Sequence, residues 1–555
     1  MRRIKRHNNR KKINWHVLLW VPVGTAAVVA ALFFAGVLPP DAAPPAGALM
    51  PAAATPPTAA PTTTVPAVTP AATPAYDSEA EISPATAGRP VNAPSTRYEI
   101  AAIVSEPYNR ITAYMRVLYE NTTPDTLYEL VFHLPANAYY TADSPGAAAE
   151  TKTYYNGFSK GGIIIGSVSL NDTIAYFYVS DDNMRLHVPF IKEIAPGDTA
   201  EIFAEFVLDV PLRNARYGRS ELGFQLGNCW PILAVYQDGS WMADGYNSFG
   251  DPFYSETAEY IVSIAYPAGY AIAATGSVTT KEKNGMLVST IAAANAREFA
   301  CMLMPGMRRA EATRGGTAIQ SYALSADGAG RGLQLAQQAM AVLEPYLGQY
   351  PYPTLTIAQS EMQSGTGMEY PGLIFVQRKL YLPGNEQQLA FTIRHEVAHQ
   401  WFYGLVGNDQ YNAPWIDEAF ASYFGLYATL LAGDEEAYRA LHKYYIEECA
   451  PLGGRIDGAL YDYANEYDYN NAVYWRGATL IEALHQEIGE DAFKAGLRLF
   501  FAENAYRVAT KADIVSAFER ACGKELATWF DDRLAAPRPV NIATATELSI
   551  GLDTE

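Results

Sequence analysis

The chain has 555 residues, enough for two or three domains and a large hydrophobic core. Its formal net charge is −19, and the first twelve residues carry +7, so the rest of the chain carries −26. An acidic body argues against nucleic-acid binding and weakly favours cationic ligands such as peptide amino termini. The four cysteines show no metal-type spacing, and nothing in their positions selects a disulfide pairing.

Residues 1–12 form a basic tail, and residues 13–38 are predicted to be a transmembrane signal anchor. No Asp, Glu, Lys or Arg occurs between Lys12 and Asp41, and the apolar stretch that begins at Val17 has about the ~20 residues of a spanning helix. The basic flank favours a cytoplasmic amino terminus, so we expect a single-pass protein of the cell membrane with its folded region extracellular. A cleaved signal peptide, which would give a secreted form, is the alternative.

Residues 39–95 are expected to be an extended extracellular linker, because eleven prolines fall between residues 39 and 75 with almost no charge. Ordered sequence begins near Tyr98. From residue 96 to residue 312 the chain alternates apolar and polar positions in aromatic and β-branched segments such as AEIFAEFVLDV. This pattern predicts an amino-terminal all-β domain of sandwich or saddle type.

The apolar period changes near residue 330. GLQLAQQAMAVLEPYLG has a helical pattern, PTLTIAQS and GLIFVQ have strand patterns, and several long helical patterns follow to about residue 535. We therefore predict a second, mainly helical domain at residues 313–537, followed by a tail at residues 538–555. The predicted fold class is multidomain α+β.

The segment TIRHEVAHQWFYGLVG, residues 392–407, places His395 and His399 four residues apart, with Glu396 beside the first. Residues i and i+4 share one face of a helix, so the two imidazoles can bind one zinc ion. A chance His-Glu-x-x-His motif in this chain is roughly a one-in-a-hundred event.

The helix that carries this motif is expected to span residues 386–403. Asn385 and Gln388 fit a capping box at its start. A second, apolar stripe lies about 200° away from His395, so the helix should be buried on both sides. The stripe consists of Leu389, Ile393 and Val397.

A catalytic zinc ion takes a third protein ligand and keeps one position open. The segment APWIDEAFASYFGLYATLLAG, residues 413–433, offers Glu418 on a second predicted helix that starts after Pro414. We predict that His395, His399 and Glu418 bind one zinc ion per chain. The residues that share the face of Glu418 are small, so the two helices can approach closely: Ala421, Ser422 and Gly425.

HEVAHQWF followed by WIDEAF resembles the zinc signature of the gluzincin aminopeptidases, the group of aminopeptidase N and leukotriene-A hydrolase. The resemblance runs from about residue 98 to residue 535 and lacks the large helical carboxy-terminal domain of longer members. It implies a thermolysin-like catalytic domain at residues 313–537 and release of amino-terminal residues from peptide substrates. Glu396 would act as the general base of this reaction without binding the ion.

The resemblance also implies roles in substrate binding. SGTGMEYPGLIF resembles the family's Gly-x-Met-Glu-Asn strand, so Gly367 and Met368 would pair with substrate backbone and Glu369 would bind the free α-amine. The chain departs from this pattern at two positions, where Thr366 replaces the Gly and Tyr370 replaces the Asn.

Two further positions gain meaning from the resemblance. Tyr474, in YNNAVYWRGATL, matches the family tyrosine that donates a hydrogen bond to the developing oxyanion, although Arg476 replaces the lysine of that motif. Gln225, in LGFQLGNCW, lies in a stretch similar to the one where the family's amino-terminal domain offers a Gln or Glu to the substrate amine.

Two alternative functions stay open. An endopeptidase or oligopeptidase would share the chemistry without requiring a free amino terminus, and the departures at Thr366 and Tyr370 keep this alternative open. A stalked surface binding module would hold an inert zinc site. Four intact candidate residues argue against an inert site: Glu369, Glu396, Glu418 and Tyr474. The expected partners are peptide substrates and the membrane, not nucleic acid.

Overall fold

The computed structural model describes residues 94–251 and 254–536. The predicted basic tail, transmembrane anchor, most of the linker and the carboxy-terminal tail lie outside these ranges. Within them, no helix is long and apolar enough to cross a membrane. The four cysteines all lie in the described part of the chain, and each is a free thiol.

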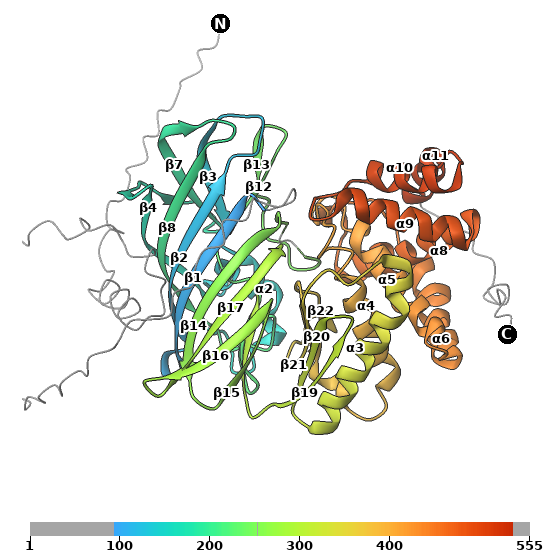
Figure 1. The fold of residues 1–555 in the computed structure, drawn as a ribbon, viewed down its shortest axis with the longest axis horizontal. Coiled ribbons are helices and arrows are strands. Elements are labelled where there is room, and N and C mark those ends of the chain that lie inside the picture. The colour runs from blue at the N-terminus through green and yellow to red at the C-terminus, as the bar shows by residue number, and fades with distance from the viewer. Residues whose placement is uncertain (1–93, 252–253, 537–555) are drawn as a thin grey trace, which may run out of the picture.

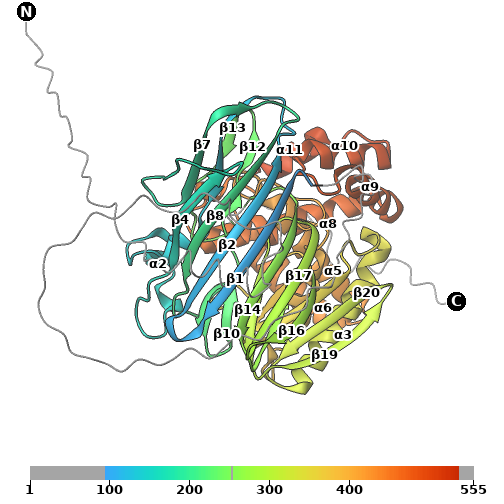
Figure 2. The ribbon, with the colours of Figure 1, turned by 60° about the vertical axis from the view of Figure 1, so that its left-hand side comes forward.

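A β-rich part and a mainly helical part lie side by side (Figure 1). The largest element of the β-rich part is an eight-stranded sheet, in which β1 pairs in parallel with β14 and antiparallel with β2. Figure 2 shows its long strands side by side, with the carboxy-terminal helices behind them. In spatial order the strands are β16 (Ser277–Lys283), β17 (Met286–Ala296), β14 (Ala258–Pro267), β1 (Thr96–Ser105), β2 (Arg110–Glu120), β8 (Thr199–Asp209), β4 (Gly162–Leu170) and β5 (Thr173–Ile174).

Two four-stranded sheets and one hairpin complete the β-rich part. One sheet has the order β15 (Tyr270–Ala274), β18 (Cys301–Pro305), β10 (Gly223–Leu226), β9 (Tyr217–Ser220). The other has the order β11 (Ile232–Leu233), β3 (Leu127–His133), β7 (Arg185–Ile194), β6 (Tyr178–Val179), and the hairpin joins β12 (Val235–Gln237) to β13 (Ser240–Met242). Alternate side chains of these strands form one buried core, as the alternating sequence predicts. A short helix, α2 (Pro145–Ala149), also belongs to this part.

The second part is built on a five-stranded sheet with the order β19 (Arg308–Arg314), β20 (Thr317–Ala323), β21 (Thr354–Ser360), β23 (Leu373–Gln377), β22 (Gly367–Met368). The predicted domain boundary at residue 312 falls inside β19. The helices are α3 (Ala326–Leu347), α4 (Glu386–Ala398), α5 (Trp415–Leu431), α6 (Glu435–His442), α7 (Glu466–Tyr469), α8 (Gly477–Ile488), α9 (Glu490–Asn504), α10 (Lys511–Cys522) and α11 (Ala527–Leu534). The predicted fold class, an all-β part followed by a mainly helical part, is confirmed.

Helix α4 begins at Glu386 as predicted, but its capping and its carboxy-terminal end differ from the prediction. The capping box is wrong: the Asn385 side chain donates to the carbonyl of Lys379, and no side chain caps the helix. The helix ends at Ala398 rather than residue 403, and the chain turns at Tyr403, whose φ of 99° is left-handed. Arg297 of the β-rich part donates to the Tyr403 carbonyl, so a contact between the two parts holds the turn that follows this helix.

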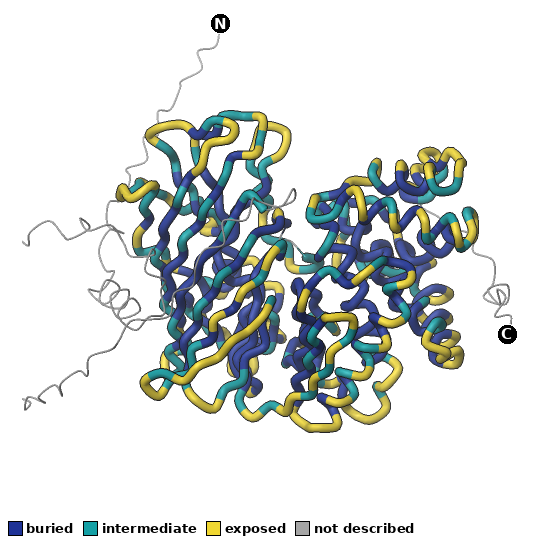
Figure 3. The backbone as a smooth tube through the Cα atoms, in the orientation of Figure 1, coloured by how far each residue is buried: buried dark blue, intermediate teal, exposed yellow. Residues whose placement is uncertain are grey.

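The core of the second part encloses α4 on both sides, as predicted. Every residue from Leu389 to Ala398 is buried, and Figure 3 shows the buried segments gathered in the interiors of both parts. Helix α4 packs against α3, α5 and the sheet strands β22 and β23. Polar side chains from Leu389 to Ala398 are therefore shielded from water except where the cleft reaches them.

Candidate metal centre and substrate cleft

A cleft of about 260 Å³ opens where the two parts meet. The β-rich part contributes Glu150, Arg216 and residues 246–251 to its wall. The second part contributes residues 364–369 and, from its helices, the side chains that carry the predicted zinc motif. The cleft wall therefore combines side chains that lie more than 200 residues apart in the sequence.

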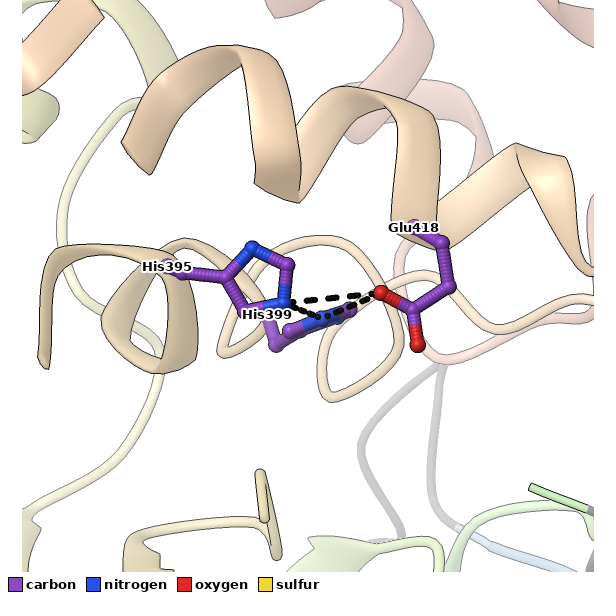
Figure 4. Close-up of side chains that lie close together, drawn as sticks. All are labelled: His395, His399 and Glu418. Carbon is purple, nitrogen blue, oxygen red and sulfur yellow. Dashed lines mark hydrogen bonds and ion pairs between the residues drawn. The ribbon is translucent and has the colours of Figure 1, made fainter. Parts of the chain in front are cut away.

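The three predicted metal ligands converge at the floor of this cleft (Figure 4). The Nε2 atoms of His395 and His399 lie 3.1 Å apart. The Glu418 carboxylate, on the neighbouring helix α5, points at both rings, with its Oε2 atom 3.5 Å from His395 Nε2 and 3.2 Å from His399 Nε2.

These separations fit a zinc ion. With metal–ligand distances of about 2.0–2.1 Å, the ligands of a tetrahedral zinc ion lie roughly 3.3 Å from one another. Two imidazole nitrogens and a carboxylate are a common zinc donor set, and three protein ligands leave the fourth position open. His399 Nδ1 lies 3.1 Å from the Phe402 carbonyl, a hydrogen bond that directs the other ring nitrogen towards the ion.

The charges around these ligands also favour a cation. Although burial alone would raise it, the pKa of Glu418 is lowered to about 2 by the two imidazoles. Burial disfavours a charged His399, yet the carboxylates of Glu369, Glu418 and Glu396 raise its pKa well above the usual value. A divalent cation satisfies the same demand for positive charge and competes with the proton.

The small face of α5 explains why Glu418 reaches the imidazoles. A Cβ atom added to Gly425 would lie 2.9 Å from the Phe391 ring and 3.3 Å from the Cβ of His395. The helices α4 and α5 are therefore so close that the Phe391 side chain of α4 contacts the backbone of α5 at Gly425. The other small residues on this face, Ala421 and Ser422, are fully buried.

Glu396 faces the cleft rather than the ligand atoms. Its Oε1 atom lies over β22, where a Cβ atom added to Gly367 would be 2.0 Å away, and its Oε2 atom is buried without a hydrogen-bond partner. Burial raises the pKa of Glu396 to about 8, against the lowering effect of His399. The group can thus carry a proton near neutral pH.

The outer edge of strand β22 is free to pair with a substrate backbone. This strand and the residue after it contain Gly367, Met368 and Glu369. Strand β22 is the last strand of the five-stranded sheet, so among the described residues its outer edge has no strand partner. Glu369 follows directly, is 4% exposed and lines the cleft, and its Oε1 atom has no hydrogen-bond partner. Burial and then the charge of Asp251 raise the pKa of Glu369 well above its usual range. A bound cation would stabilise its carboxylate.

The two departures on this strand do not disturb the cleft wall. Tyr370 is fully buried and turns towards the β-rich part, where its hydroxyl donates to the Asn228 side chain at 2.9 Å. A Cβ atom added to Gly227 would lie 1.8 Å from that hydroxyl, so the tyrosine fills the space above a glycine. Thr366 lines the cleft, and its carbonyl accepts from the Gln377 amide.

Tyr474 lies beside the metal ligands. It belongs to a π-helical stretch, Asn470–Arg476, and its hydroxyl donates to Glu418 Oε1 at 2.5 Å. Burial raises its pKa well above the usual value, and the Glu418 charge adds to this effect, so the phenol keeps its proton. Arg476, at the lysine position of the motif, is buried and donates to the Gly453 and Gly454 carbonyls.

Gln225 is not brought to the cleft. It is fully buried in β10, and its Oε1 atom accepts a hydrogen bond from the Glu361 amide at 3.0 Å. The β-rich part instead presents Asp251 to the cleft, beside Arg216. Sequence reasoning missed Asp251, because it lies in an irregular connection with no motif around it.

Two imidazoles and a carboxylate from adjoining helices, with a free glutamate beside the first imidazole, define a gluzincin-type zinc metallopeptidase site. Comparison with known proteins agrees. Residues 331–532 match the model of the Peptidase family M1 domain. This match covers most of the mainly helical part, which is therefore similar to a Peptidase family M1 domain.

Curated relatives share part of this sequence. The chain is 26% identical over 256 residues to aminopeptidase N of Lactococcus lactis subsp. lactis. The aligned region covers 40% of this chain and 29% of the relative. The chain is 28% identical over 190 residues to the membrane alanyl aminopeptidase of Heliothis virescens, covering 30% and 18%. The matches thus span about a quarter of the length of these relatives.

The fold extends the similarity to the β-rich part. A crystal structure of an M1 zinc metallopeptidase from Deinococcus radiodurans superposes with a TM-score of 0.56 at 17% sequence identity. The superposition covers 80% of this chain and 96% of that one. At this identity the likeness shows a shared two-part fold.

Proposed function

We propose that this protein is a zinc aminopeptidase that releases single residues from the amino termini of peptides. The observation that carries the proposal is the short distance between two carboxylates in the cleft. The carboxylate oxygens of Glu369 and Glu418 lie within 4.8 Å of each other. Consecutive Cα atoms are about 3.8 Å apart, so only one residue fits between an amine at Glu369 and a carbonyl at the metal ligands.

The metal site supplies the electrophile for this reaction. His395, His399 and Glu418 would hold a zinc ion, which would supply a Lewis acid for the scissile carbonyl and for water, whose pKa such an ion lowers towards ~7. The protein side chains supply the rest. Glu396 accepts a proton from the attacking water and delivers it to the leaving amine. Tyr474 donates a hydrogen bond to the oxygen that gains charge, and the outer edge of β22 pairs with the substrate backbone.

The test compares a short peptide with its N-acetylated form, each with and without a zinc chelator. We expect release of the first amino acid from the free peptide only, and loss of this activity after chelation. A protein of similar fold supports peptides as the substrate class: the Deinococcus radiodurans M1 metallopeptidase has been crystallised with a Tyr-Ser-Ala substrate.

Two other outcomes would replace the proposal. Equal cleavage of both peptides would identify an endopeptidase or oligopeptidase. Zinc binding without cleavage of either would identify a binding module with an inert site.

We further propose that residues 13–38 anchor the chain in the cell membrane with the catalytic part outside. The support is the uncharged apolar stretch and the seven basic residues before it. In cells that express the full chain, we expect the protein in the membrane fraction and its carboxy terminus accessible to external protease.

A matched variant tests the anchor. Val28→Arg with Leu32→Arg places two charges in the stretch, each unfavourable by roughly 2.5–3.5 kcal/mol at the centre of a span. We expect this variant to leave the membrane fraction. A wild-type protein that is cleaved and released would favour the signal-peptide alternative.

A further inference from the structure

The strand β22 and the helix α4 run in the same direction along the cleft. Gly367 lies against Glu396, where an added Cβ atom would be 2.0 Å from the carboxylate. Two residues further on, the Glu369 carbonyl accepts from the Gln400 side chain at 3.4 Å. A substrate with its amine at Glu369 and its scissile bond at Glu396 therefore runs against the direction of β22. Beyond that bond it passes Thr392, one helical turn before Glu396.

The cleft wall at this end of α4 is aromatic. Three rings that line the cleft pack on one another: those of Phe391, Tyr445 and Trp475. The ring centroids of Tyr445 and Trp475 lie 3.8 Å apart with 20° between the ring planes, and those of Phe391 and Tyr445 lie 5.2 Å apart. The Phe391 ring also lies 6.0 Å from the ring of His395. These three rings, here called the aromatic wall, thus begin next to a metal ligand.

Two π-helical stretches hold the aromatic wall. Lys443–Cys449 carries Tyr445, and Asn470–Arg476 carries Trp475 next to Tyr474. The two stretches pack against each other. π-Helical turns are rare and occur frequently at functional sites. In the second stretch two consecutive residues, Tyr474 and Trp475, both line the cleft. The hydrogen-bond donor to the oxyanion and the aromatic wall therefore share one backbone element.

The accessible part of the aromatic wall is Trp475. Phe391 and Tyr445 are buried, whereas Trp475 is only half-buried. The Tyr445 hydroxyl donates to the Gln388 side chain at 2.9 Å, which fixes the orientation of its ring. Thr392 also lines the cleft, is 1% exposed, and its Oγ1 atom has no hydrogen-bond partner. An indole supported by two rings and a free buried hydroxyl are groups that a bound peptide can satisfy.

The aromatic wall suits an apolar side chain, and an aromatic one best. An aromatic side chain buries about 150–250 Å² of surface, and ring pairs add stabilisation beyond that area. A basic side chain could lie over the indole, but the wall and its neighbours Gln388 and Thr392 supply no carboxylate to pair with it.

We propose that the aromatic wall binds the side chain of the second substrate residue and favours an aromatic residue there. The inference rests on the aminopeptidase function proposed above and specifies its substrates: peptides with an aromatic residue in the second position. Trp475 makes the contact, and Phe391 and Tyr445 are positioning residues. The second residue becomes the new amino terminus, so the aromatic wall selects on the leaving side of the bond.

The test compares three substrates of the zinc-loaded full chain: the L-phenylalaninamide, glycinamide and L-lysinamide derivatives of L-leucine. All three share the first residue, and chromatography measures the released leucine. We expect kcat/KM for leucyl-phenylalaninamide to exceed that for leucyl-glycinamide about 10- to 100-fold. The difference should lie mainly in KM, because the side chain is bound equally before and during the reaction. Leucyl-lysinamide should resemble leucyl-glycinamide.

The variant Trp475→Ala should lower the preference for phenylalanine over glycine about 10-fold. A purely structural disturbance of Tyr474 would instead lower kcat for both substrates and leave this preference unchanged. Trp529→Ala, at a half-buried tryptophan of α11 outside the cleft wall, is the matched control and should keep the preference. If Trp475→Ala does not fold, Trp475→Phe keeps a smaller ring and should lower the preference several-fold.

A binding measurement separates recognition from turnover. In a zinc-loaded Glu396→Gln protein, calorimetry should show leucyl-phenylalaninamide bound about 10- to 100-fold more tightly than leucyl-glycinamide. Adding Trp475→Ala to this protein should remove most of the difference.

Three results would overturn the inference. The first is equal kcat/KM for the phenylalanine and glycine substrates in the wild type. The second is an unchanged preference in both Trp475→Ala and Trp475→Phe. The third is a preference for leucyl-lysinamide, which would indicate a site for basic side chains. In all three cases leucine is still released, so the aminopeptidase function stands. Release of leucine from none of the substrates would refute that function, and the inference with it.

Discussion

Glu396 and Gly367 show how single residues set the chemistry of the cleft. Glu396 follows a metal ligand in the sequence, yet its carboxylate lies over the strand β22 and away from the imidazoles. Only a glycine at position 367 leaves room for the Glu396 carboxylate over this strand. Burial at this place raises the pKa of Glu396 to about 8, which suits transfer of a proton in both directions near neutral pH.

At this scale, Glu396→Gln and His399→Ala should differ in the metal that they retain. Glu396→Gln keeps the shape and all three ligands but cannot accept a proton, so we expect full zinc content and a fall in kcat of about 10²- to 10⁴-fold. His399→Ala removes a ligand and should lose both zinc and activity. Elemental analysis of the purified proteins, together with peptide hydrolysis, distinguishes the two. A zinc-loaded Glu396→Gln protein with normal kcat would exclude Glu396 as the base.

The packing of α4 on α5 decides whether the three ligands meet. Both helices carry their ligands on a face that is otherwise small or aromatic, and they are in close contact at Gly425. The contact is local to two helices, but the position of Glu418 depends on it. A change of a few tenths of an ångström there moves the carboxylate relative to both imidazoles.

At the scale of these elements, Gly425→Ala should weaken zinc binding. The added methyl group would lie 2.9 Å from the Phe391 ring, so one helix must shift; we expect a loss of about 1–3 kcal/mol in stability and roughly 10- to 100-fold in zinc affinity. Gly330→Ala in α3 is the matched control. Its added methyl group meets no atom within 4 Å, so that variant should gain about 0.4–1 kcal/mol and keep its zinc. Equal zinc affinity in both variants would contradict this account of the helix contact.

The two parts of the molecule are joined by a buried polar network. Tyr370 donates to Asn228, and the Asn228 side chain donates to Glu298 at 2.6 Å. Tyr403, just beyond α4, donates to the other oxygen of Glu298. Burial raises the pKa of Glu298 to about 7, although the Tyr403 hydrogen bond lowers it. Tyr370 departs from the family strand pattern. Its hydrogen bond contributes to the contact between the two parts.

For the whole molecule, this network predicts a stability that falls as pH rises from about 4.5 to about 7. The folded protein keeps the Glu298 proton in this range and the unfolded chain releases it, so the folded state binds more protons. From 4.5 to about 7 the change is at most about 3 kcal/mol. Denaturant unfolding at several pH values should show a slope that is smaller in Glu298→Gln than in the wild type. Glu282→Gln, on an exposed strand, should keep the wild-type slope; an unchanged slope in Glu298→Gln would contradict the prediction.

The sequence by itself determined the features that depend on local spacing. His395 and His399 share a face because they are four residues apart, and Glu418 lies on a face of small residues for the same kind of reason. Alternation of apolar residues was sufficient to predict the β-rich part, and the change of period was sufficient to predict the helical part. These patterns act over a few residues, so they can be read without knowing how distant segments meet.

Only the tertiary structure decided what lies opposite these local elements. Asp251 rather than Gln225 faces the cleft, because the path of an irregular connection, not a motif, brings it there. The turn at Tyr403 that follows helix α4 is bound by Arg297 from the other part. Tyr370 contacts the β-rich part because Gly227 leaves space for its ring. Each of these contacts joins residues more than 100 positions apart, and their meeting depends on the packing of two whole parts, which no short stretch of sequence specifies.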